Sequence, residues 1–125
     1  MVNLKGKAVF LSGPMSGARF YNVAGFAEAH AKLKVAGVHE VYNPAIEYLD
    51  TTARESVAPH EFWMRRCIQE LTKPERTNSI FENDMSAHYG ALVSLPGWQE
   101  SEGARTERMV AEACGIPCYE LDEVV

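Results

Sequence analysis

The sequence contains little that would build a zinc site or a disulfide framework. Its 125 residues include three cysteines, Cys67, Cys114 and Cys118, which form no CxxC pair, and four scattered histidines. Structural zinc sites use paired ligands at short spacing, so we expect no bound metal. Cys114 and Cys118 flank a Gly-Ile-Pro segment between a predicted helix and a predicted strand, and we expect both to be small buried apolar side chains.

Basic residues and long apolar runs are also scarce. Twelve Lys and Arg residues stand against 17 Asp and Glu, which gives a formal net charge of −5. No positive field therefore attracts a nucleic-acid backbone, and no duplex partner is expected. No stretch approaches the roughly 20 apolar residues of a membrane span, and the first residues lack the apolar core of a signal peptide. We expect a cytoplasmic protein that does not bind membranes, with residues 1–125 forming a single domain.

What the sequence does contain is an alternation of short apolar runs and amphipathic segments. The apolar runs predict strands over residues 7–12, 38–42, 90–95 and 116–119. Helices are predicted over residues 22–36, 60–71 and 102–114, the second because Trp63, Cys67 and Leu71 recur at a spacing of four. Gly37 is placed to end the first helix. A loop over 46–58 and a short helix over 79–86 complete the prediction.

This alternation predicts the α/β class, with a mostly parallel four- or five-stranded sheet and helices on both faces. In such sheets, ligands bind beyond the carboxyl ends of the strands. Those ends carry Gly13-Pro14-Met15-Ser16-Gly17, Asn43-Pro44 and Pro96-Gly97-Trp98. We expect these loops to converge on one edge of the sheet and to form the ligand site.

The first of these loops, residues 13–17, is built of residues whose backbone N–H groups could approach an anion or sugar hydroxyls. It lacks the Gly-Lys-Ser/Thr of a Walker loop and does not match GxGxxG. A plain turn between strand and helix accounts equally well for the same residues. The loop alone therefore leaves its role open.

Glu107 is the most unusual residue of the sequence. If a helix starts near Gly103, Glu107 shares a face with Val110, Ala111 and Cys114, so an acid lies on the stripe expected to face the core. In one interpretation, Glu107 lies in the first turn and complements the positive end of the helix dipole. In the other, it is a partly desolvated carboxylate that the helix terminus keeps ionised, which suits a nucleophile.

Ser101 and two tryptophans each have two interpretations. Ser101 precedes the helix that carries Glu107, and we expect it to be the N-cap, a role compatible with contact to a phosphate. Trp63 and Trp98 either pack in the core or offer a ring face to a nucleobase. Packing is the simpler expectation for both.

Several groups of residues resemble nucleoside 2-deoxyribosyltransferase-like proteins, most closely the small DUF4406 branch found in bacteria and phages. The resemblance covers most of the chain except residues 46–59 and 72–88. The matching residues are Phe-Leu-Ser-Gly-Pro-Met-Ser-Gly over 10–17, Asn22 with Phe26, Asn43-Pro44-Ala45, Trp63-Met64-Arg65, and Leu-Pro-Gly-Trp-x-x-Ser-x-Gly-Ala-x-x-Glu over 95–107.

This resemblance implies a flavodoxin-like three-layer α/β/α sandwich, a homodimer or larger homo-oligomer, and no cofactor. It implies cleavage or transfer at the N-glycosidic bond of a small-molecule nucleoside or nucleoside 5′-monophosphate. Glu107 matches the nucleophile that attacks the anomeric carbon. Relatives that act on 5′-monophosphates resemble this chain at Ser101, which favours a phosphorylated ligand. The other residues matched to substrate binding are Gly13, Pro14, Met15, Ser16, Gly17, Asn43, Gly97, Gly103 and, beside the base, Trp98.

Three positions depart from the family pattern. Phe10 replaces a tyrosine that orients the nucleophile, Cys67 stands where an acid contacts the leaving base, and Gly90 replaces an aspartate that opens the third strand. Asp84 is the other candidate for the catalytic acid. The alternative function is therefore a non-catalytic nucleotide-binding or sensor module with a degenerate site. A structural subunit that binds no nucleotide is a third possibility.

Overall fold

The fold is built on a parallel sheet with helices on both faces. The computed structural model describes residues 1–15, 22–46, 60–73 and 89–125. Ser16, Gly17, Asp84, the predicted helix over 79–86 and nearly all of the predicted loop over 46–58 lie outside the described residues. The strands in the described ranges are all parallel, and they are β1 (Ala8–Ser12), β2 (Glu40–Tyr42), β3 (Ala91–Ser94) and β4 (Cys118–Glu120).

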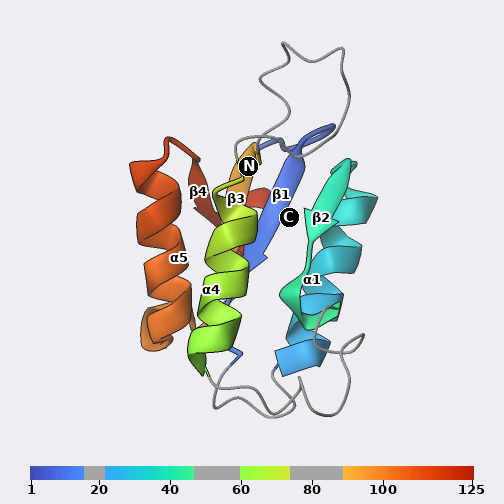
Figure 1. The fold of residues 1–125 in the computed structure, drawn as a ribbon. Helices are drawn as coiled ribbons and strands as arrows, with labels where there is room; N and C mark the ends of the chain where they lie inside the picture. Colours follow the sequence, from blue (N-terminus) through green and yellow to red (C-terminus); the bar gives the residue numbers. More distant parts are fainter. Residues whose placement is uncertain (16–21, 47–59, 74–88) are drawn as a thin grey trace.

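The order of the strands, β2-β1-β3-β4, is flavodoxin-like. The chain starts inside the sheet at β1, moves to the edge strand β2, and then crosses back past β1 to β3 and β4. Figure 1 shows helices α4 (His60–Leu71) and α5 (Glu102–Ala113) side by side, with α1 (Val23–Val35) apart from them. The predicted α/β/α sandwich is therefore confirmed.

Successive side chains of β1 face the two helical layers in turn, because strand side chains alternate between the faces of a sheet. Val9 and Leu11 belong to a core shared with residues of α1 and of the short C-terminal helix α6 (Leu121–Val124). Phe10 belongs to the second core, formed with residues of α4 and α5. Ser12 follows on the face of Phe10. All five residues of β1 are buried since both of its faces are covered.

Helices α4 and α1 form within one residue of the bounds that the sequence predicts. Helix α4 has the predicted bounds, and its buried residues are Trp63, Cys67 and Leu71, at the predicted spacing of four. Helix α1 ends at its C-cap Ala36, and Gly37 follows with a left-handed φ of 92°. A glycine accepts this conformation without the steric penalty of a Cβ atom.

The structure corrects the prediction for two cysteines near the C-terminus. Cys114 is exposed rather than buried, because it is the C-cap of α5, where the chain leaves the helix and turns at Gly115 with a φ of 77°. Cys118 is half-buried. It begins β4, which starts two residues later than predicted, after Pro117, whose nitrogen has no hydrogen to donate to a neighbouring strand.

Within the described residues, the short helices that the sequence does not predict include the 3-10 helix η3 (Trp98–Glu100) and α6. Helix α6 begins with a capping box formed by Glu120 and Glu123. Both helices are too short to show a hydrophobic period. A bilayer-crossing helix would have to be longer and more apolar than any found in the described ranges.

Candidate functional site

Glu107 lies inside the protein, in the second turn of α5. The helix begins at Glu102, and Glu107 is 6% exposed. It shares the buried face of the helix with Ala104 and Ala111. The interpretation that places Glu107 in the first turn is therefore wrong, whereas its predicted position on the core-facing stripe is confirmed.

Two hydrogen-bond donors hold the Glu107 carboxylate. The Ser12 hydroxyl, at the carboxyl end of β1, donates to Glu107 Oε1 over 2.6 Å. The thiol of Cys67, on α4, donates a second hydrogen bond to the carboxylate. Three elements that are distant in the sequence thus meet at one side chain, near the edge of the sheet at which α/β proteins bind ligands.

Burial controls the protonation of Glu107. Loss of water around the carboxylate disfavours its charged form and raises its pKa from 4.5 to about 7. The hydrogen bonds from Ser12 and Cys67 oppose this rise. The sequence-based expectation that the helix terminus keeps Glu107 ionised is therefore corrected: near neutral pH this side chain is divided between the acid and the carboxylate.

A small pocket, here the Glu107 pocket, opens beside this carboxylate. Its volume is about 40 Å³. Of the residues predicted to bind substrate, Gly13, Met15, Ser101 and Gly103 line it together with Glu107. The loop after β1 and the start of α5 therefore meet at one edge of the sheet, in the arrangement expected from the strand ends.

Helix α4 forms another wall of the pocket, of which the sequence indicates Trp63 and Cys67 as candidates but not His60 and Met64. His60, Trp63, Met64 and Cys67 line this wall. Their spacing of three to seven residues predicts that they share a helix face, but it does not show which helix that face meets. Trp63 is buried, as the packing interpretation predicts, and it also borders the pocket.

Gly103 allows α4 and α5 to approach closely beside the pocket. A Cβ atom at this position would lie 3.0 Å from Met64 Sδ and 3.4 Å from His60 Cε1. The contact with Met64 would be tight and the one with His60 ordinary, so a larger residue at this position would require the Met64 side chain to shift. Direct contact of Gly103 with substrate stays a prediction.

Ser101 is the N-cap of α5, as predicted. Its φ and ψ are −105° and 117°, and its Oγ accepts a hydrogen bond of 3.2 Å from the Ala104 N–H. Ser101 also lines the Glu107 pocket. Its contact with a phosphate stays a prediction.

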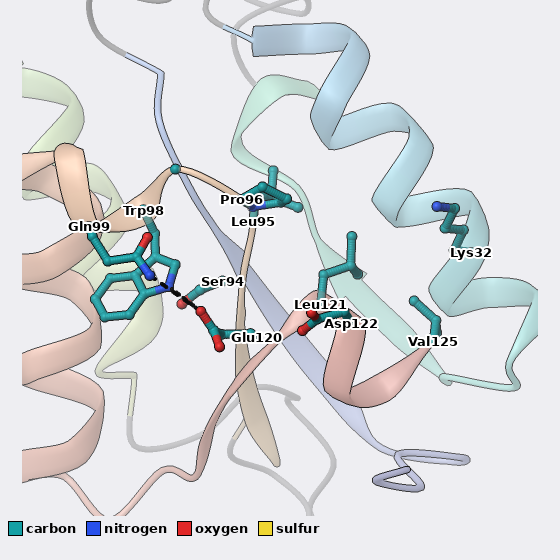
Figure 2. Close-up of a pocket in the computed structure, with 11 residues that line it drawn as sticks. Lys32, Ser94, Leu95, Pro96, Trp98, Gln99, Glu120, Leu121, Asp122 and Val125 are labelled. Atoms are coloured by element: carbon teal, nitrogen blue, oxygen red, sulfur yellow. Dashed lines mark hydrogen bonds between the residues drawn. The ribbon is translucent and has the colours of Figure 1, made fainter.

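Gly97 and Trp98 line a second cavity, separate from the Glu107 pocket. Figure 2 shows this cavity beyond the ends of β3 and β4, with α1 on its far side. Its volume is about 370 Å³. The lining consists of residues 94–99, residues 120–122, Lys32 and Val125.

Polar contacts hold the Trp98 ring in place. Its Nε1 donates to Glu120 Oε1 over 3.1 Å (Figure 2). The guanidinium carbon of Arg108 lies 4.4 Å from the ring centroid, a cation–π geometry. Trp98 therefore joins η3 to the start of α6 and to α5, and its contact with a base stays a prediction.

Asn43 and Pro14 are engaged in local contacts. The Asn43 Oδ1 accepts a hydrogen bond of 2.9 Å from the Ala45 N–H, and its Nδ2 lies 3.3 Å from His30 Nδ1. A Cβ atom on Gly97 would lie 3.5 Å from Pro14 Cγ. The hydrogen bonds account for Asn43 structurally, and the roles of Asn43 and Pro14 in substrate binding stay predictions.

Phe10 supplies no polar group to the site. Its ring stacks on Tyr42, with centroids 4.9 Å apart and an interplanar angle of 21°, and meets Tyr89 edge-on at 5.6 Å. Ser12, two residues later on the same face of β1, brings the hydroxyl that contacts Glu107. The period of a strand predicts that residues 10 and 12 share a face, but no sequence signal pairs Ser12 with Glu107.

The groups that line the Glu107 pocket include a carboxylate, a hydroxyl, a thiol and an imidazole, from Glu107, Ser101, Cys67 and His60. Across the described ranges, no three His, Cys, Asp or Glu side chains gather into a group that could hold a metal ion. These four groups can act as nucleophile, hydrogen-bond donors and proton carriers.

Comparison with known proteins identifies the family of the chain. A family model described as a domain of unknown function (DUF4406) matches residues 7–119, a range that includes Ser12, Cys67 and Glu107. Comparisons with curated proteins and with solved structures give no match. Because the family model spans most of the sequence, the chain belongs to the DUF4406 family.

Proposed function

We propose that this protein cleaves or transfers the N-glycosidic bond of a nucleoside or nucleoside 5′-monophosphate, with Glu107 as the nucleophile. The observation that carries the proposal is a buried carboxylate beside a pocket, whose Oε1 accepts a 2.6 Å hydrogen bond from Ser12. A carboxylate held in this way has little freedom to turn away from a bound substrate. The resemblance to nucleoside 2-deoxyribosyltransferase-like proteins supports this substrate class.

The proposed reaction has two steps. An oxygen of ionised Glu107 attacks the anomeric carbon, and the carbon–nitrogen bond breaks, so its electron pair leaves with the base, which takes up a proton. Water or a second base then attacks the same carbon, gives up its proton to the group that protonated the leaving base, and releases the carboxylate, with retained configuration. Because only the ionised form attacks, a pKa of about 7 makes the reactive fraction of Glu107 sensitive to pH near neutrality.

Two further parts of the pocket have roles in this scheme. His60 lines the pocket from the start of α4, and its imidazole can donate the proton that the leaving base takes up. Ser101, Gly103 and Ala104 line it at the N-terminus of α5. The partial positive charge of a helix N-terminus favours an anion there, such as a 5′-phosphate.

The test is a screen for released base. The protein is incubated with the common ribonucleosides and deoxyribonucleosides and with their 5′-monophosphates, and free base is measured by chromatography. We expect release from at least one substrate and a loss of about a thousandfold in Glu107→Gln, whose amide accepts hydrogen bonds but does not attack. Glu102→Gln, an exposed position on the same helix, is the control that keeps activity.

A non-catalytic nucleotide-binding or sensor module is the second candidate function. Phe10 and Cys67 favour it, because a ring and a thiol stand where the resemblance places a tyrosine and an acid. This function predicts that nucleotides bind in calorimetry while no base is released from any substrate of the panel. Such a result would contradict the catalytic proposal.

The proposal includes a homodimer or larger homo-oligomer, as the resemblance implies, and a place in the cytoplasm, as the sequence composition predicts. Sedimentation of the purified protein measures the assembly. A monomer at concentrations where base is released would show that one chain carries a complete site.

A further inference from the structure

The hydroxyl of Ser12 has a fixed place beside Glu107. Ser12 is 0% exposed and Glu107 is 6% exposed, so water competes little for the hydrogen bond between them. Its length of 2.6 Å lies in the range of charge-assisted O–H···O bonds. Ser12 belongs to β1, an interior strand that pairs with β2 on one side and β3 on the other. The donor is therefore anchored in an interior strand of the sheet, where Ser12 itself pairs with Ser94 of β3.

We propose that Ser12 is the positioning residue of the nucleophile, whose hydroxyl holds the Glu107 carboxylate in the orientation for attack. This inference rests on the proposed function. In the family that the chain resembles, a tyrosine at the position of Phe10 has this task. Here the Phe10 ring is enclosed between Tyr42 and Tyr89, and the hydroxyl comes from two residues further along the same strand face.

Burial of a serine at this level of the sheet does not by itself produce a hydrogen bond to Glu107, as Ser94 shows. Ser94 pairs in register with Ser12 across β1 and β3, and it is 1% exposed. Its Oγ accepts a hydrogen bond of 3.2 Å from Arg108 Nη1. Ser94 is therefore a matched control: it has the same residue type, the same depth and a polar partner on the same helix, but not Glu107.

A titration of Glu107 also depends on the charged and titratable side chains near it. On α4, Cys67 donates to the carboxylate and His60 lines the same pocket. On α5, the guanidinium of Arg108 is engaged with Ser94 and lies over the Trp98 ring. In the described ranges, the titratable side chains that share the pocket with Glu107 are thus Cys67 and His60.

The first test measures Glu107 directly in the protein without substrate. The pKa of Glu107 is followed by NMR of its side-chain carboxyl carbon in wild type, Ser12→Ala, Ser12→Thr and Ser94→Ala. Loss of a hydrogen bond to the charged form raises this pKa by about one to two units in Ser12→Ala. Ser12→Thr restores the wild-type pKa because it keeps the hydroxyl, and Ser94→Ala leaves it unchanged. An unchanged pKa in Ser12→Ala, or an equal rise in Ser94→Ala, would overturn the proposal.

The second test measures turnover. In Ser12→Ala, kcat falls about tenfold to a hundredfold at nearly constant KM, and the acidic limb of the pH profile moves up with the pKa. A rise in KM at constant kcat would overturn the positioning role, since it would mean that Ser12 binds substrate. If the wild-type protein releases no base, the proposed function fails, and the NMR titration still decides whether Ser12 controls Glu107.

Discussion

A Cβ atom placed on Gly13 would lie 2.8 Å from the Cβ of Leu95. The two residues directly follow β1 and β3, and the Leu95 N–H donates a hydrogen bond of 2.8 Å to the Ser12 carbonyl. The chain therefore leaves both strands in close contact. Gly13 also lines the Glu107 pocket, and its contact with Leu95 leaves no room for a larger residue.

Gly13→Ala is expected to destabilise the fold. The new methyl group meets an atom fixed to the Leu95 backbone, so we expect a loss of about 1 to 3 kcal/mol in the free energy of unfolding. Urea denaturation measures the loss. Gly90→Ala is the milder control, because its Cβ would lie 3.3 Å from the nearest Lys7 atoms, against 2.8 Å at Gly13, so a small shift of the neighbour accommodates it. Equal losses in both variants would contradict the close contact.

The raised pKa of Glu107 predicts a pH dependence of stability. Glu107 ionises with its ordinary value of 4.5 in the unfolded chain and at about 7 in the folded protein. Between these values the folded state binds more protons than the unfolded state, so the free energy of unfolding falls as pH rises. The loss approaches about 1.4 kcal/mol per pH unit and totals about 3 kcal/mol once the pH exceeds the folded pKa.

Urea denaturation of wild type and Glu107→Gln isolates this effect. An amide does not titrate, so the stability difference between the two proteins changes by about 2 to 3 kcal/mol between about pH 5 and about pH 8. Other titrating groups cancel in the comparison. Parallel pH dependences of the two proteins would mean that Glu107 is not desolvated as the structure describes.

Substitutions at Ser101 separate helix capping from ligand binding. Ser101→Ala removes the side-chain acceptor for the Ala104 N–H and lowers the free energy of unfolding by about 1 kcal/mol. Ser101→Asp keeps a capping oxygen and adds a negative charge at the helix N-terminus, so stability is kept. That charge repels a 5′-phosphate, and the preference moves by about tenfold from monophosphates toward free nucleosides. An unchanged preference in the initial rates would place the phosphate elsewhere.

Trp98→Phe tests whether this ring is structural. The substitution keeps an aromatic ring beneath Arg108 and removes the donor to Glu120, so the free energy of unfolding falls by about 1 kcal/mol. Because Trp98 lines the second cavity and not the Glu107 pocket, we expect KM to stay nearly constant. A rise of KM by about tenfold would instead mean that a base contacts the indole.

Local patterns explain why some elements are predictable from the sequence. Helix α4 presents Trp63, Cys67 and Leu71 at a regular spacing over several turns, and both its type and its bounds follow from this pattern. Helix α6 has four residues, too few for any period, and only the acidic pair of its capping box marks it. Cys114 lies on the core-facing stripe of α5. It is also the residue at which the helix ends, so the stripe does not predict that Cys114 is exposed.

The candidate site is predictable from the sequence only in part, because some of its contacts join residues that lie far apart in the sequence. The burial of Glu107 follows from the helical stripe, and the capping role of Ser101 follows from its place before the helix. The hydrogen bond between Ser12 and Glu107 does not follow from the sequence, because it joins residues 95 positions apart and depends on how α5 docks on the sheet. The pKa also depends on docking, because desolvation outweighs the two donors only once α4, α5 and β1 have closed around the carboxylate.

A covalent bond between Glu107 and the sugar tests the proposed function most directly. Turnover of the substrate found in the base-release screen is stopped with acid, the protein is digested, and the peptides are analysed by mass spectrometry. We expect the peptide that contains Glu107 to gain the mass of the sugar or phosphosugar, and Glu107→Gln to show neither this adduct nor base release. Base release at the full rate in Glu107→Gln, with no adduct on the wild-type peptide, would contradict Glu107 as the nucleophile.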